Sequence, residues 1–189
     1  MLYKFEEYGY CAEITGFRGV RFEQADAYLK ANRKAGQQKV WIQFFNADLV
    51  ATGEHLYFAV LNALCAFRGG TNLSKSLAME TMLYASSERQ IQKAIQAVGI
   101  KPDSSDVALV VIGETPEVIQ AELKEVTAAL KTEPCTAVLN LTPKKTVKIK
   151  EAFKITPAIL EVAKIKGKTE DLALVDLVVE KVALLATEL

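Results

Sequence analysis

The chain has 189 residues, half of them hydrophobic, so it can bury a full core without a disulfide or metal staple. Lys plus Arg and Asp plus Glu both total 23, so the net charge neither indicates nor excludes a polyanionic partner. No signal peptide or apolar run of about 18 residues is present, which predicts a cytoplasmic protein that is not exported and does not span a membrane. The three cysteines are widely spaced and form no C-x-x-C pattern, which agrees with a reducing compartment and argues against a zinc site.

Two β-prone runs flank a helix near the start of the chain. Tyr8–Thr15 predicts a short strand, and Glu23–Ala35 has the pattern of a modest helix. Val40–Phe45 is apolar on both faces, which predicts a central strand of a sheet.

Three helices follow without an intervening strand. The first, Glu54–Phe67, is apolar on nearly all sides, which predicts burial against several neighbours and places Cys65 in the core. Gly69-Gly70 ends this helix, as glycine commonly does after a helix C-terminus.

The second and third of these helices are separated by a serine pair. The second is expected over Ser74–Ala85. The third is expected to open at Ser87, because Gln90 follows at the spacing of a capping box, and to end at Gly99.

The second half returns to alternating strands and helices. Val107–Ile112 is a fully apolar strand, and Thr115-Pro116 starts a helix that runs to about Lys131. Thr146–Ile149 reads as a strand that points lysines to one face and apolar side chains to the other. Thr156-Pro157 starts another helix, and an amphipathic helix over Glu170–Thr187 closes the chain.

These elements predict a single α+β domain over residues 1–189. Its sheet is mixed but mostly antiparallel, with strands from both ends of the chain. A layer of helices covers it and includes the three-helix central insert.

Motifs for catalysis are scarce. His55 is the only histidine and stands in the first turn of a helix, where the helix dipole favours its neutral form. No G-x-S-x-G or paired acidic motif accompanies it, so a structural or ligand-contact role is favoured over that of a general base. Gly69–Ser76 approaches the phosphate-loop pattern, but Ser74 replaces the second glycine and the segment follows a helix instead of a strand. We therefore expect a protein without catalysis, cofactor or metal of its own.

Basic residues lie around the turns that join the central helices, namely Arg68, Lys75, Arg89 and Lys93. These turns also present helix N-termini, whose unpaired N–H groups favour anions. A second basic stretch, residues 144–168, holds eight lysines and two glutamates. Both patches read either as ordinary solvated lysines or as a phosphate-tracking surface for nucleic acid. Aromatic residues are sparse beside them, Phe67 and Tyr84 being nearest, which argues against stacking of several bases but still fits a short nucleic-acid end.

The closing helix carries a wide apolar stripe that includes Leu172, Val175, Val182 and Leu185. Such a stripe fits a deeply packed final helix, or a helix whose end offers a surface to a partner.

The central helices carry a family resemblance. Residues 54–67 (EHLYFAVLNALCAF) continue into residues 70–77 (GTNLSKSL), then into residues 80–86 (ETMLYAS) and Arg89-Gln90-Ile91. This pattern, about a quarter of the chain, resembles the PRPK-binding protein family, the small regulatory subunit of the KEOPS complex. Members usually have Ser-Gly before the Arg-Gln-Ile run, where this chain has Ser86-Ser87.

The resemblance implies a non-catalytic archaeal subunit that binds and activates the kinase-like ATPase subunit of KEOPS. Through that kinase it would serve the transferase subunit, which installs threonylcarbamoyl on a tRNA adenosine. Archaeal proteins similar to this one also bind the tRNA 3′ CCA end.

The matching positions give the expected tRNA contacts. Lys75 and Arg89 would hold phosphates, while Asn72 and Gln90 would hydrogen-bond base or sugar edges. Arg68 and Lys93 are added on chemical grounds because they lie beside the same turns. Leu77, Val182 and Leu185 are expected to dock the kinase subunit through an apolar interface.

Two other classes of function stay open on the residues alone. One is a small-molecule-binding α+β domain with a pocket near His55. The other is a small enzyme that uses His55 as its general base.

Overall fold

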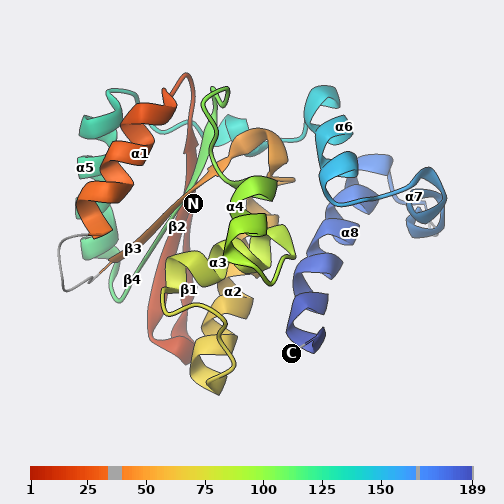
Figure 1. Ribbon diagram of the computed structural model, residues 1–189, viewed down its shortest axis with the longest axis horizontal. Helices are drawn as coiled ribbons and strands as arrows, with labels where there is room; N and C mark the ends of the chain where they lie inside the picture. The colour runs from red at the N-terminus through yellow and green to blue at the C-terminus, as the bar shows by residue number, and fades with distance from the viewer. Residues whose placement is uncertain (34–39, 165–166, 189) are drawn as a thin grey trace.

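The computed structural model describes residues 1–33, 40–164 and 167–188. Within these ranges an antiparallel sheet of four strands has the order β1-β2-β4-β3 (Figure 1). The strands are β1 (Leu2–Phe5), β2 (Tyr10–Phe17), β3 (Val40–Asn46) and β4 (Val107–Gly113). β4 is buried along its whole length because strands flank it on both sides and helices cover both of its faces. Three strands match the predicted runs, while β1 was not predicted.

Helices cover both faces of this sheet (Figure 1). α1 (Phe22–Arg33) and α5 (Pro116–Leu130) lie on one face, and α2 (Gly53–Gly69), α3 (Leu77–Ser86) and α4 (Ile91–Val98) lie on the other. The neighbouring side chains of Phe44 and Phe45 are both fully buried, one in each of the two resulting cores. The apolar pattern of β3 on both faces is thus explained, and the α+β class is confirmed. The last two residues of the predicted helix Glu23–Ala35 lie outside the described residues.

A third group of helices lies beyond α2 (Figure 1). It contains α6 (Pro143–Ala152), α7 (Pro157–Ala163) and α8 (Glu170–Leu184), and α8 packs on both α2 and α3 while α7 extends outward. The helices begin at threonines whose side chains accept a backbone N–H of the first turn, at Thr142, Thr156 and Thr169. Short 3₁₀ segments occupy Glu6–Tyr8, Ala47–Leu49, Thr136–Leu139 and Leu185–Glu188. In the described part of the chain, no helix combines the length and hydropathy that a membrane crossing needs.

The predicted strand Thr146–Ile149 is wrong, because these residues lie inside α6. Pro143 stands in the first turn of this helix, where its fixed φ favours a helix start. Ile149 is fully buried whereas Val147 is 66% exposed, since side chains two residues apart lie on nearly opposite sides of a helix. Lys145 and Ile149 form the buried face at i, i+4 spacing. The apolar–polar alternation over Thr146–Ile149 is too short to distinguish this helical pattern from a strand.

The predicted capping box at Ser87 is also wrong. Ser87 has a φ of 54° and closes α3: its N–H donates to the Tyr84 carbonyl at 3.0 Å, and the Glu88 N–H donates to the Leu83 carbonyl at 3.1 Å. α4 therefore begins later, at Ile91. The preceding helix begins at Leu77 instead of Ser74, because residues 73–76 form a turn.

Cys65 differs from its predicted place in the core. It lies on the outer side of α2 and is exposed, although α2 is otherwise largely buried. Its Sγ lies 2.8 Å from the hydroxyl of Tyr8. The N-terminal hairpin therefore reaches the side of α2 that the sequence had assigned to core.

Candidate nucleic-acid interface

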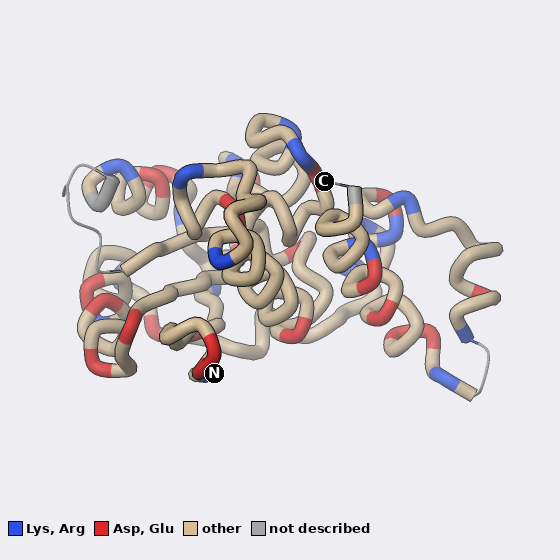
Figure 2. The backbone as a smooth tube through the Cα atoms, turned by 90° about the horizontal axis from the view of Figure 1, so that it is seen from below, with Lys and Arg blue, Asp and Glu red and all other residues tan. Residues whose placement is uncertain are grey.

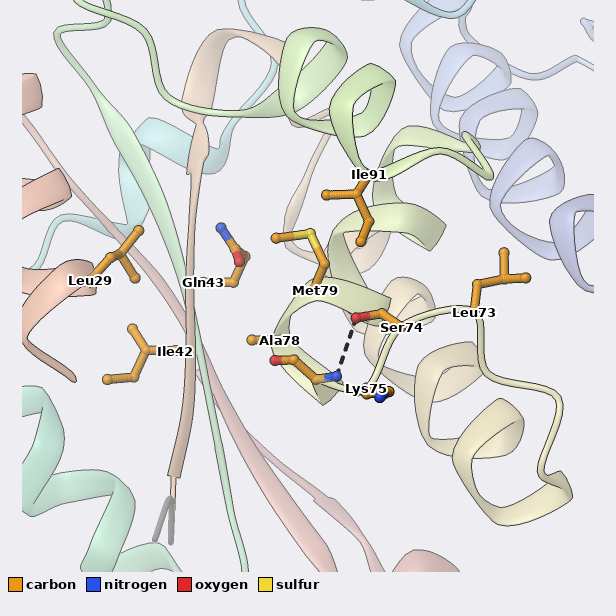
Figure 3. Close-up of a pocket in the computed structure, with 10 residues that line it drawn as sticks. Leu29, Ile42, Gln43, Leu73, Ser74, Lys75, Ala78, Met79 and Ile91 are labelled. Atoms are coloured by element: carbon orange, nitrogen blue, oxygen red, sulfur yellow. Dashed lines mark hydrogen bonds between the residues drawn. The ribbon is translucent and has the colours of Figure 1, made fainter. Parts of the chain in front are cut away.

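A cavity of about 510 Å³ opens where the turn 73–76 meets the edge strand β3 and the start of α4 (Figure 3). We call it the Lys75 cavity; it is lined by Leu29, Ile42, Gln43, Leu73, Ser74, Lys75, Ser76, Ala78, Met79 and Ile91. The side chains of Gln43, Met79 and Ile91 come from β3, α3 and α4 and lie beside one another in Figure 3. The cavity therefore combines apolar walls with one cation and a few polar groups, as ligand sites commonly do.

Glu80 holds the turn of this cavity in place. The residue is 1% exposed, and its carboxylate accepts the backbone N–H groups of Leu73 at 3.1 Å and Ser74 at 2.7 Å. The Ser74 hydroxyl accepts the N–H of Ser76 at 3.2 Å, the dashed contact in Figure 3. Asn72 donates from its side-chain amide to the Ser74 carbonyl at 2.9 Å. Charge-assisted bonds to Glu80 thus fix the backbone that carries Lys75.

Two helix N-termini meet at the Lys75 cavity. α3 has Ser76 as its N-terminal cap and α4 has Gln90, and neither side chain caps its own helix. Ser76 and Ile91 both line the cavity, so α3 and α4 both begin beside it. The positive ends of the two helix dipoles add to the Lys75 charge, an arrangement that favours a bound anion.

The predicted tRNA contacts divide between two places. Lys75 lines the cavity, and Arg89 and Gln90 are exposed immediately before Ile91, which also lines it. Lys93 is exposed in the first turn of α4 but is not a lining residue. Arg68 lies on the other side of the turn, where its guanidinium is 3.9 Å from the Glu7 carboxylate.

Arg68 lines a second cavity, of about 330 Å³, which we call the aromatic cleft. Its walls are Glu7, Tyr8, Tyr10, Trp41, Leu64, Phe67, Arg68 and Leu77. The Tyr10 and Trp41 rings meet edge to face at 5.6 Å, and the Arg68 guanidinium lies 5.5 Å from the centre of the Tyr8 ring. The hydrogen bond with Cys65, more than burial, raises the pKa of Tyr8.

The aromatic cleft is the feature that sequence reasoning missed. Of the two aromatic residues that it named near the basic turns, Phe67 lines the cleft and Tyr84 is buried. The other three rings come from the β1–β2 hairpin and β3, far from Phe67 along the chain. No local pattern could have grouped them, because Tyr10 and Trp41 come from β2 and β3, which lie on either side of β4 in the sheet.

The three residues predicted for the kinase interface lie in the core. Leu77, Val182 and Leu185 are 2%, 0% and 3% exposed. The exposed apolar surface nearby is a groove of about 480 Å³ between α7 and α8, lined by Ala158, Ile159, Val162, Ala163, Leu177 and Glu180. In this α7–α8 groove Val162 is 66% exposed. A partner at this end of the molecule would meet these side chains and not the three buried ones.

The second basic stretch is largely neutralised by the fold. Lys148 lies 2.6 Å from Asp48 and Lys164 lies 2.7 Å from Glu161. Lys150 pairs with Glu170, and Lys168 pairs with Asp176. Basic and acidic segments are accordingly interspersed around α6, α7 and α8 (Figure 2). Lys166, another lysine of this stretch, lies outside the described residues.

His55 is enclosed instead of facing a pocket. It is fully buried; its Nδ1 accepts the Ala51 N–H at 3.2 Å, and its Nε2 lies 2.8 Å from the Ala85 carbonyl. Burial lowers the pKa of His55 to about 4, so the ring is neutral at neutral pH. With both nitrogens bonded to backbone, the ring is placed as a structural element and not as a general base.

The fold and these surfaces define an α+β protein that carries two cavities and an exposed apolar groove. The chain belongs to the family described as kinase binding protein CGI-121, whose family model matches residues 17–186. It is also 34% identical over 88 residues to the regulatory protein Cgi121 of Methanocaldococcus jannaschii, a match that covers 47% of this chain and 52% of the relative. The chain thus spans about half the length of that curated relative. These findings confirm the resemblance indicated by the central helices.

Proposed function

We propose that this protein is a non-catalytic regulatory subunit of the KEOPS complex, which binds the kinase-like ATPase subunit and the tRNA 3′ CCA end. In this role it supports the threonylcarbamoyl modification of tRNA in the cytoplasm, through the kinase and the transferase subunit. The observation that carries the tRNA part is the meeting of two helix N-termini with Lys75 at one cavity. The kinase part rests on the family description.

The Lys75 cavity has the chemistry that a short RNA end requires. Phosphates would be held by Lys75, Arg89 and the first-turn N–H groups of α3 and α4. The apolar side chains of the cavity offer surfaces for base faces, and Gln90 stands beside them to reach a base or sugar edge. Asn72 would act through the turn, because it donates to the Ser74 carbonyl.

Binding of full-length tRNA and of tRNA lacking CCA tests this role. We expect the shortened tRNA to bind at least about tenfold more weakly, and Lys75→Ala and Arg89→Ala each to reduce the salt dependence of binding by about one charge. Lys124→Ala is the matched control, because Lys124 is an exposed lysine on α5 that lines neither the Lys75 cavity nor the aromatic cleft. Equal affinity for the two tRNAs would refute the proposed role.

Kinase docking is proposed at the α7–α8 groove, whose exposed apolar side chains would be buried by a partner. Val162→Asp should weaken association with the kinase subunit by at least about tenfold, because it places a charge in the interface. Val147→Asp is a closely matched control, since Val147 is also 66% exposed but lies on α6. Co-purification or calorimetry with the kinase subunit measures both variants, and equal effects of the two would exclude the groove.

A further inference from the structure

We infer that the aromatic cleft is a second base-binding position, which takes the planar face of a nucleobase next to the strand held at the Lys75 cavity. This inference rests on the proposed function for its macromolecular ligand. The binding chemistry of the cleft itself can be tested with mononucleotides alone.

The rings of the cleft are arranged for a planar guest. Tyr8, Tyr10, Trp41 and Phe67 are each half-buried, so each presents part of its surface to the cavity. The volume of about 330 Å³ exceeds that of a single nucleobase. Aromatic side chains bind bases by stacking, an interaction that tolerates any base because every base has a π face.

The charged pair at the cleft suits the edge of a base better than an apolar chain. Glu7 and Arg68 both line the cavity, the first as a hydrogen-bond acceptor and the second as a fork of donors. Their side chains are 81% and 64% exposed, so water already solvates both and a ligand edge can replace that water at small cost. Base edges carry donors and acceptors side by side, which matches such a pair.

The position of the cleft relative to the Lys75 cavity supports the same ligand. Leu77 lines the aromatic cleft, while Ser76 and Ala78 line the Lys75 cavity. The two cavities therefore share one wall, the segment that joins the turn 73–76 to α3. A single RNA strand that crosses this wall would place a phosphate at the N-termini of α3 and α4 and a base among the rings of the aromatic cleft. A proline-rich peptide would use the rings too, but it would gain nothing from the adjoining cationic site.

Trp41 provides a direct test, because it is the only tryptophan in the chain. We expect adenosine and cytidine 5′-monophosphates, and an RNA hexamer ending in CCA, to quench its fluorescence saturably. Phe67→Leu should weaken this binding about tenfold by removing a stacking face while keeping an apolar side chain. Arg68→Ala should weaken it as well, and Lys124→Ala should leave it unchanged.

The outcomes separate this inference from the proposed function. If the hexamer binds with an affinity that depends on Lys75, as followed by anisotropy of a labelled RNA, but Trp41 is not quenched and Phe67→Leu is neutral, the cleft inference is overturned and the proposed function stands. If the mononucleotides quench Trp41 with the expected dependence on Phe67, while tRNA binds equally well with and without its CCA end, the cleft inference stands and the proposed function is refuted. Quenching by a proline-rich peptide and not by nucleotides also overturns the inference.

Discussion

His55 makes the stability of this protein depend on pH. The folded state keeps the ring neutral, with a pKa of about 4, whereas the unfolded chain has the ordinary value of 6.5. Between these pH values the unfolded state binds more protons than the folded state, so stability falls as the pH falls. At about 1.4 kcal/mol per pKa unit, the complete loss is about 3 kcal/mol. Below pH 4 the titration of His55 causes no further loss of stability, and above pH 6.5 the ring is neutral in both states and the full stability is present.

Urea unfolding at several values between pH 7.5 and 4.5 measures this effect, with His55→Gln as the control. Glutamine can accept the Ala51 N–H and donate to the Ala85 carbonyl, so it keeps both hydrogen bonds without the titration. Because the carboxylates titrate in both proteins, the difference between the two curves isolates His55. We expect wild type to lose about 2 to 3 kcal/mol more than the variant over this range. Parallel curves would refute the reasoning.

Three further substitutions test features of the fold. Glu80→Ala leaves two backbone N–H groups of the turn without their acceptor, so it should lower the free energy of unfolding by about 2 kcal/mol. Hydrogen exchange of the amides at residues 73–76 should also become faster, and unchanged exchange would contradict the role of Glu80. Ser87→Gly should stabilise the protein by about 1 kcal/mol, because residue 87 has a φ of 54° and its hydroxyl is buried without a partner; a lower melting temperature would contradict this. Burial lowers the pKa of Lys145 to about 8 from 10.5, so between these pH values the unfolded chain binds more protons and wild-type stability should rise with pH. Lys145→Met should abolish that rise in urea unfolding. The same rise in both proteins would assign it to another group.

Ser87 stands where this chain departs from the pattern of the family resemblance. The resemblance implies glycine at this position, and the backbone here is left-handed, a conformation that glycine adopts without strain. The serine at this position follows α3 and leaves the start of α4 to Gln90. The sequence spacing of Ser87 and Gln90 was correct for a capping box, but the backbone conformation that a cap requires was not visible in it.

The sequence by itself determined the elements whose signals are local. The apolar runs of β3 and β4, the end of α2 at Gly69-Gly70 and the Thr-Pro starts of α5 and α7 all follow from side-chain pattern and backbone preference within a few residues. The central motif also indicated the family that the comparisons confirm.

Only the tertiary structure decided which apolar faces are core and which are exposed. Leu77, Val182 and Leu185 are apolar side chains of the kind that an interface uses, but the fold buries all three. Leu77 stands in the wall of the aromatic cleft, and Val182 lies on α8, which packs on α2 and α3. The aromatic cleft needs Tyr10 and Trp41 from strands on either side of β4, so its existence depends on the sheet order. The physical reason is common to these cases: hydrophobic periodicity fixes the direction of a side chain on its own element, and contacts between distant elements decide what it faces.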